Sequence, residues 1–178
     1  MTKIILHKLN NRAIFFMMTT AVILIFAMYI VSIYTRDKYC INLSSSMPYG
    51  LYKISAPASL KRGDIIIFMP PDYLKSIIYQ RRWLPEGWPL MKQIGALPGD
   101  TYCINKDRQF LINGRFVGPV YKIDSQGLPL PQIDGCRTVE PGTFLPVATH
   151  ILKSFDGRYF GAIPLNIIKG KAVPVYSF

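Results

Sequence analysis

One stretch of this chain is long and apolar enough to cross a lipid bilayer. Residues 13–34 read AIFFMMTTAVILIFAMYIVSIY and contain no charged side chain. As an α-helix this run spans roughly 33 Å at about 1.5 Å per residue, which matches the hydrocarbon core of a membrane. A cleaved secretory signal is the alternative, but its apolar stretch is about 7–15 residues long and ends at a small-residue site. This run is longer and ends at bulky Tyr34, so we interpret it as an uncleaved anchor.

The anchor divides the chain into a leading tail (residues 1–12), the transmembrane segment (residues 13–34) and one domain (residues 35–178). The flanking charges predict the orientation of the anchor. The basic residues are Lys3, Lys8 and Arg12 before the apolar run, and Arg36 and Lys38 after it. Because basic residues are commoner on the cytoplasmic side of a membrane, we expect a cytoplasmic N-terminus and an exported domain.

The net charge of +11 favours an anionic membrane surface, an acidic partner or nucleic acid. The sequence contains no zinc-finger spacing, RNA-binding signature or recognition-helix pattern. A basic domain tethered to anionic lipid explains the charge more simply. We therefore expect the lipid bilayer as a partner and no nucleic acid, and we expect neither a metal ion nor a cofactor.

The chain has three cysteines. Cys103 and Cys136 lie inside the predicted exported domain, where an oxidising compartment would permit one disulfide between them. Cys40 is then left over near the membrane. The alternative is that all three are buried thiols.

Residues 35–178 read mainly as short strands separated by Gly and Pro. The predicted strands are Gly50–Ile54, Asp64–Phe68, Leu90–Ile94, Thr101–Ile104, Phe110–Ile112, Thr143–Leu145, Arg158–Ile163 and Ala172–Tyr176. Asn113 and Gly114 lie between two apolar runs and predict a two-residue β-hairpin, because both central positions of a type I′ turn need positive φ.

One segment has the pattern of a short helix. Asp72 is placed to cap it, and Tyr73, Leu74, Ile77 and Ile78 would share one face. The predicted fold is therefore a mostly β domain with one or two short helices, behind one N-terminal transmembrane helix.

A turn rich in hydroxyl groups follows the anchor, at Ser44-Ser45-Ser46-Met47-Pro48-Tyr49-Gly50. A catalytic serine needs an exposed hydroxyl on a rigid turn, with backbone N–H groups directed to the place where charge develops. Such turns are common, and a structural turn is the alternative. Whether this turn is catalytic or structural therefore depends on whether the chain also supplies a base for the serine.

A serine nucleophile also needs a base. His150 is the single histidine of the domain, and we expect a surface or packing role for it, since no spacing supports a triad. A lysine can serve if its pKa falls by roughly three units, which costs about 4 kcal/mol and which apolar neighbours can cause. Strand alternation puts Lys92 on one face with Leu90 and Ile94, so Lys92 is the best candidate. A lysine that snorkels at a sheet edge is the alternative.

Four segments together resemble the type I signal peptidase family of serine proteases, whose members use a Ser/Lys dyad. In the family's order they are 44–48 (SSSMP), 62–68 (RGDIIIF), 92–100 (KQIGALPGD) and 154–161 (SFDGRYFG). The resemblance implies a signal-peptidase-like, LexA-like β fold. It also implies that Ser46 is the nucleophile and Lys92 the general base. Ser44 would join the backbone N–H of Ser46 in the oxyanion hole. The supporting residues would be Ser154, which orients the lysine, and the structural ion pair Asp156–Arg158.

Departures from the general pattern narrow the resemblance. General signal peptidases usually place one residue between the Met and the Pro, whereas here Pro48 follows Met47 directly. Three further features are similar to TraF-type peptidases of conjugative transfer systems: the stretch 49–52 (YGLY), the motif at 154–161, and the pair Cys103 and Cys136. The usual Gly-Asp-Asn stretch ahead of the last motif is replaced by residues 148–153 (ATHILK).

The TraF-type resemblance implies that the chain is a single-pass protein of the bacterial inner membrane with a periplasmic catalytic domain. Its substrate would be an exported precursor, the pilin of a type IV secretion apparatus, whose trimmed ends some members join into a ring. Other components of the transfer complex would be partners. Two further classes stay open: a non-catalytic scaffold of the channel, and a membrane-tethered nucleic-acid-binding component. The sequence does not separate hydrolysis from ring closure.

Overall fold

The computed structural model describes residues 11–35 and 38–178, and the chain divides after Tyr39 into two units. The first contains helix α1 (Asn11–Thr35), of which Arg12–Thr35 is long and apolar enough to cross a membrane. The predicted helical anchor at residues 13–34 is therefore confirmed as a helix. The side chains Lys3, Lys8 and Arg36, on which the predicted orientation rests, lie outside the described residues.

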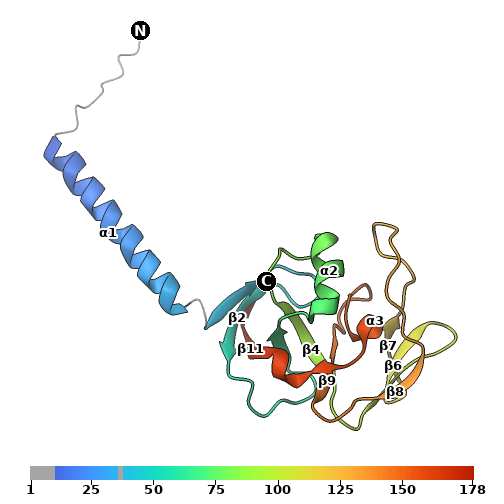
Figure 1. The fold of residues 1–178 in the computed structure, drawn as a ribbon. Coiled ribbons are helices and arrows are strands. Elements are labelled where there is room, and N and C mark those ends of the chain that lie inside the picture. Colours follow the sequence, from blue (N-terminus) through green and yellow to red (C-terminus); the bar gives the residue numbers. More distant parts are fainter. Residues whose placement is uncertain (1–10, 36–37) are drawn as a thin grey trace. The chain divides into compact units, whose positions relative to one another are not determined.

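The second unit is mostly β, as predicted. A seven-stranded sheet has the order β1-β2-β11-β3-β4-β9-β10, and a four-stranded sheet has the order β7-β6-β5-β8. In chain order the elements are β1 (Tyr39–Asn42), β2 (Gly50–Ser55), β3 (Ile65–Phe68), α2 (Asp72–Gln80), β4 (Leu90–Ala96), β5 (Thr101–Ile104), β6 (Gln109–Ile112), β7 (Arg115–Pro119), β8 (Gly135–Thr138), β9 (Thr143–Val147), α3 (Gly157–Phe160), β10 (Ile163–Pro164), the 3-10 turn η1 (Leu165–Ile167) and β11 (Ile168–Ser177). Strands β6, β7 and β8 lie at the end of the domain away from β2 (Figure 1).

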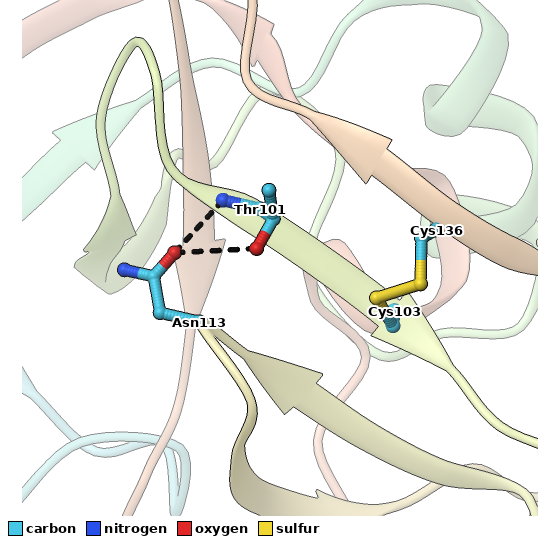
Figure 2. The surroundings of a disulfide bond; sticks show 4 residues. All are labelled: Thr101, Cys103, Asn113 and Cys136. Atoms are coloured by element: carbon cyan, nitrogen blue, oxygen red, sulfur yellow. Dashed lines mark hydrogen bonds between the residues drawn. A yellow bond between two sulfur atoms is a disulfide. The ribbon is translucent and has the colours of Figure 1, made fainter.

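The predicted hairpin is present between β6 and β7. Asn113 and Gly114 have φ of 49° and 74°, and Ile112 pairs with Arg115 across the turn. The side chain of Asn113 also accepts hydrogen bonds from the N–H and hydroxyl of Thr101, at 2.9 and 3.4 Å (Figure 2). The turn is thus tied to the start of the neighbouring strand β5.

Two sequence predictions about local structure were wrong. The first half of the predicted strand Arg158–Ile163 belongs to helix α3, because the Asp156 side chain accepts a hydrogen bond from the Arg158 N–H and starts a helical turn, and only Ile163 lies in a strand. At α2 the cap residue is Pro71, without a side-chain bond, whereas Asp72 pairs with Lys75 one turn later at 2.6 Å.

The predicted apolar face of α2 is only partly correct. Leu74 and Ile78 are buried, but Tyr73 is 63% exposed. Leu74 and Ile78 belong to an apolar cluster that also contains Phe68, Leu90 and Ile94 of the seven-stranded sheet. The helix therefore covers this face of the sheet.

Strand β4 connects that cluster to a second one, which lies against the four-stranded sheet. Leu90 and Ile94 belong to the first cluster, whereas Ala96 packs with Tyr102 and Phe110 in the second. Residues in the middle of β4 are consequently far from water on the inward face.

A disulfide joins Cys103 of β5 to Cys136 of β8, which face each other directly in the antiparallel pair (Figure 2). Cys40 is a free, half-buried thiol. The structure thus contains the pairing expected from the sequence, and the alternative of three unpaired thiols was wrong.

We expect the pair Cys103→Ala and Cys136→Ala to destabilise the domain. The bridge closes a loop across a sequence separation of 33 residues, and a cross-link of that length limits the unfolded chain by an equivalent of about 3–4 kcal/mol. Urea unfolding of the full chain in detergent, in a Cys40→Ala background, measures the loss. Cys40→Ala alone is the control and should shift the midpoint little. Equal midpoints with and without the disulfide would contradict the prediction.

Candidate active site

Lys92 lies in the middle of β4 and is only 3% exposed. It pairs with Ile66 of β3, and it shares the inward face of its strand with Leu90 and Ile94, as the alternation predicts. Both neighbours belong to the apolar cluster under α2. The alternative of a lysine that snorkels at a sheet edge was therefore wrong.

The surroundings of Lys92 favour its neutral form. Burial lowers the pKa of its amine from 10.5 to about 8, while the charge of Asp156 raises that pKa and the charge of Arg158 lowers it. The Nζ atom donates a hydrogen bond to Ser154 Oγ at 2.8 Å, and Ser154 is itself buried. With a pKa of about 8, roughly one amine in ten is neutral at pH 7.

Asp156 and Arg158 form a fully buried ion pair, with Nε and Oδ1 separated by 2.8 Å and Nη2 and Oδ2 by 3.2 Å. The guanidinium also donates to the carbonyls of Ala148 and Leu152, and Asp156 Oδ2 accepts from the Ala148 N–H. A Cβ on Gly118 would lie 2.7 Å from Arg158 Nη1, so glycine is needed there. The pair fixes both ends of residues 148–152.

Phe155 anchors the chain between Ser154 and Asp156. Its ring stacks on Tyr159, with centroids 5.6 Å apart, and contacts Trp83 at 4.9 Å. A partly buried aromatic side chain packed on this cluster restricts the backbone on either side of it. Ser154 is thus held toward Lys92 from both directions.

The second and third sequence motifs are structural partners. Arg62 Nε donates to Asp100 Oδ2 at 2.6 Å, and backbone hydrogen bonds join Gly63 and Asp64 to Ile94 of β4. Asp64 also pairs with Lys171 of β11 at 2.6 Å. These contacts hold β4 in place but bring no further group to Lys92.

Ser46 lies in the turn between β1 and β2. Its hydroxyl is half-buried and lies 3.3 Å from Ser44 Oγ. Met47 is 1% exposed and anchors the turn in the domain, and the Tyr52 hydroxyl donates to the Pro48 carbonyl at 2.8 Å. In residues 11–35 and 38–178 the backbone N–H of Ser46 has no acceptor, so it is available to bind a developing oxyanion.

Two residues that the sequence reasoning did not place in the site contact this turn. Asn42 is buried and makes five hydrogen bonds to residues 44–48. His150 is exposed, and its Nε2 lies 2.9 Å from the carbonyl oxygen of Ser45. A polar residue just before the hydroxyl-rich turn was the available signal for Asn42. The contact of His150 is with backbone, which fits the packing role expected for it.

Residues 148–154 connect the two halves of the candidate site. His150 contacts the Ser45 carbonyl, Thr149 Oγ1 donates to Gln93 Oε1 beside Lys92 at 2.7 Å, and Ser154 accepts from Lys92. No direct hydrogen bond joins Ser46 Oγ to Lys92 Nζ within the described part of the chain. Catalytic hydrogen bonds are often long in free enzymes and tighten when substrate binds.

The chemistry available here is that of a serine and an amine. Among residues 11–35 and 38–178, no group of three or more His, Cys, Asp or Glu side chains is arranged to hold a metal ion. A buried amine whose pKa is lowered to about 8 can act as the base that activates a nucleophile, provided that a hydroxyl comes within its reach.

Comparisons with known proteins identify the family to which this chain is similar. The family described as signal peptidase, peptidase S26, matches residues 9–177. The conjugal transfer protein TraF of Agrobacterium fabrum is 34% identical over 152 residues, covering 79% of this chain and 83% of that protein. A signal peptidase I of Leptolyngbya laminosa is 34% identical over 113 residues, covering 64% and 51%.

A crystal structure of a signal peptidase I from Enterococcus faecalis V583 is a structural neighbour, with a TM-score of 0.39 and 24% identity over 66% of this chain and 98% of that one. The family match over residues 9–177 includes all four motifs, at residues 44–161, from which the site was predicted.

We expect the stability advantage of Lys92→Met over the wild type to depend on pH. The folded protein binds the Lys92 proton with a pKa of about 8 and the unfolded chain with 10.5. Below pH 8 the native state therefore bears a cost of about 3 kcal/mol for the buried ammonium, and this cost disappears as pH rises to about 10.5. The variant never bears it.

The difference in unfolding free energy between Lys92→Met and the wild type should thus fall by about 3 kcal/mol between pH 7 and pH 11. Chemical denaturation across this range measures it. The lost bond to Ser154 is a constant offset and does not change the slope. Lys53→Met, at an exposed position of β2, is the matched control and should show a constant difference. A flat difference for Lys92→Met would mean an ordinary lysine pKa.

Proposed function

The chain belongs to the signal peptidase family, peptidase S26, and on that premise we propose that it is a membrane-anchored endopeptidase with a Ser46/Lys92 dyad. The observation that carries the proposal is the burial of Lys92 beside Ser154, which lowers the lysine pKa to about 8. A lysine with its ordinary pKa would be almost fully charged at neutral pH and unable to accept a proton.

The proposed reaction begins when the neutral amine of Lys92 accepts the hydroxyl proton of Ser46. The freed oxygen attacks the scissile carbonyl carbon and forms a tetrahedral intermediate. Protonated Lys92 then donates that proton to the leaving amine nitrogen as the peptide bond breaks. The acyl group remains on Ser46 as an ester until a second nucleophile releases it and restores the hydroxyl.

The backbone N–H of Ser46 and the hydroxyl of Ser44 are the proposed oxyanion donors. The N–H has no acceptor in the described residues, and Ser44 Oγ lies 3.3 Å from the nucleophilic oxygen. In the free protein Ser44 donates to Asn42 Oδ1 at 2.7 Å. Its hydroxyl must therefore rotate toward the oxyanion when substrate binds. Loss of one such donor typically costs about a hundred- to a thousand-fold in rate.

We propose an exported precursor as the substrate, specifically the pilin of a conjugative type IV secretion system. Several relatives are named as conjugal or plasmid transfer proteins TraF, from Agrobacterium and Escherichia coli. The apolar helix Arg12–Thr35 supports a membrane anchor. We propose that the membrane is the bacterial inner membrane, with a cytoplasmic N-terminus and a periplasmic catalytic domain at residues 35–178. Other components of the transfer complex would be partners at that surface.

The ester on Ser46 can be released in two ways. Water gives a trimmed linear pilin. The N-terminal amine of the same pilin gives a head-to-tail ring, because an amine held at high effective concentration can outcompete water. The two products differ in mass by one water molecule, which makes the outcome measurable.

We expect Ser46→Ala and Lys92→Ala to fold and to leave the pilin precursor unprocessed. The first removes the nucleophile and the second removes the base. The experiment is co-expression of each variant with the pilin precursor of its own transfer system, followed by mass spectrometry of the pilin. The mass locates the cleavage site and distinguishes linear from cyclic product.

The matched controls are Ser45→Ala, the adjacent exposed serine, and Lys53→Ala, an exposed lysine on a neighbouring strand. Both should process normally, as should His150→Ala. Normal processing by Ser46→Ala or Lys92→Ala would favour the non-catalytic scaffold. Loss of activity in His150→Ala but not in Lys92→Ala would replace the dyad with a histidine base.

We also expect kcat/KM to rise with pH and to level off near pH 8. The active form of the free enzyme has neutral Lys92, and its fraction grows about tenfold per pH unit below the pKa. Cleavage of the precursor by purified full chain from pH 6 to pH 9 measures this profile. Lys92→Arg should be inactive throughout, because a guanidinium stays protonated. A midpoint near 10.5, or activity that falls as pH rises, would contradict the mechanism.

A further inference from the structure

The turn that carries Ser46 has few regular backbone contacts of its own. Strand β1 ends at Asn42 and β2 begins at Gly50, so residues 43–49 lie outside both strands. Their conformation must be set by side chains. Met47 and the Tyr52 hydroxyl hold the second half of the turn, at Met47 and Pro48.

Asn42 contacts both halves of this turn at once. Its Nδ2 lies 3.0, 2.9 and 3.0 Å from the carbonyl oxygens of Ser44, Met47 and Pro48, so its two N–H groups serve three acceptors and one N–H is shared. Its Oδ1 accepts from the Ser44 N–H at 3.1 Å and from the Ser44 hydroxyl at 2.7 Å. The residue is 6% exposed, so water cannot readily replace these bonds.

We propose that Asn42 is a positioning residue that holds the backbone of residues 44–48 in the conformation that presents Ser46 for reaction. Three carbonyls directed at one amide nitrogen bring the residues before and after Ser46 to a common point. The same side chain orients Ser44, whose oxygen lies 3.3 Å from that of Ser46. The inference rests on the proposed function, because it assigns Asn42 to the chemistry of Ser46.

Asparagine is the residue type that this arrangement requires. Its amide offers two N–H donors and an acceptor oxygen on a short side chain. Aspartate has the same shape but places an acceptor against the three carbonyls. Alanine removes the bonds to the Ser44 and Met47 carbonyls and to the Ser44 N–H, and leaves the Pro48 carbonyl with the Tyr52 hydroxyl alone. Asn42 touches no reacting atom and acts only through the turn.

The experiment compares Asn42→Ala with the wild type as full chain in detergent, with the pilin precursor of its own transfer system as substrate. We expect kcat to fall about a hundredfold, the effect of a misplacement near 1 Å, while KM stays within about threefold. Hydrogen exchange should become faster in residues 43–50 and stay unchanged in β4. A folded variant with wild-type kcat would overturn the inference.

A second variant and a control keep the result interpretable. If Asn42→Ala does not fold, Asn42→Asp is the test variant, because it keeps the oxygen that accepts from Ser44. We expect its kcat to be at least tenfold lower than that of the wild type. A wild-type kcat in Asn42→Asp would overturn the inference. Asn105 is the matched control, because its side chain also binds as donor and acceptor, to Gln109, at an exposed turn. Asn105→Ala should change kcat by less than about twofold.

Ser46→Ala in the same assay separates this inference from the proposed function. If Ser46→Ala is inactive while Asn42→Ala keeps wild-type kcat, the dyad stands and the role of Asn42 is wrong. If Ser46→Ala cleaves the precursor at the wild-type rate, the proposed function fails and the role of Asn42 fails with it.

Discussion

The site depends on one amine that the fold removes from water. Lys92 is placed on a central strand of the seven-stranded sheet, between β3 and β9, with apolar neighbours along its own strand. Burial is the largest cause of its lowered pKa, ahead of either neighbouring charge. An edge strand would leave the same lysine hydrated and protonated at neutral pH. The strand order of the sheet is therefore a condition for the chemistry.

The two charged side chains that act on Lys92 shift its pKa in opposite directions. Asp156 alone would raise the pKa of the lysine and favour the ammonium, while Arg158 opposes it. Because the two are paired with each other and bonded to the backbone of residues 148–152, they add rigidity without a net local charge. Burying such an ion pair costs free energy, and substitution of only one of the two residues would leave the other charge buried without a partner. Its value here lies in fixing Ser154 against Lys92.

The sequence predicted features that depend on the pattern within one strand or one turn. It did not predict the hydrogen bonds that side chains make to backbone groups. Alternation placed Lys92 on an apolar face, and the Asn-Gly pair predicted the hairpin at residues 113–114, because both depend on local geometry. Arg158–Ile163 was assigned to a strand because a bulky apolar run hides the helix-starting bond of Asp156. Asn42 was missed since three of its partners are carbonyl groups, which every residue has and no sequence pattern marks.

The two groups of the proposed dyad come from parts of the chain with different constraints. Lys92 belongs to a strand with neighbours on both sides, so the sheet ladder determines its position. Ser46 belongs to a turn next to the edge strand β1, where one side of the backbone has no neighbouring strand. Side-chain bonds from Asn42 and Tyr52 replace the missing ladder in that turn. In the proposed mechanism the bond from Ser46 to Lys92, which is absent from the free site, forms when substrate binds.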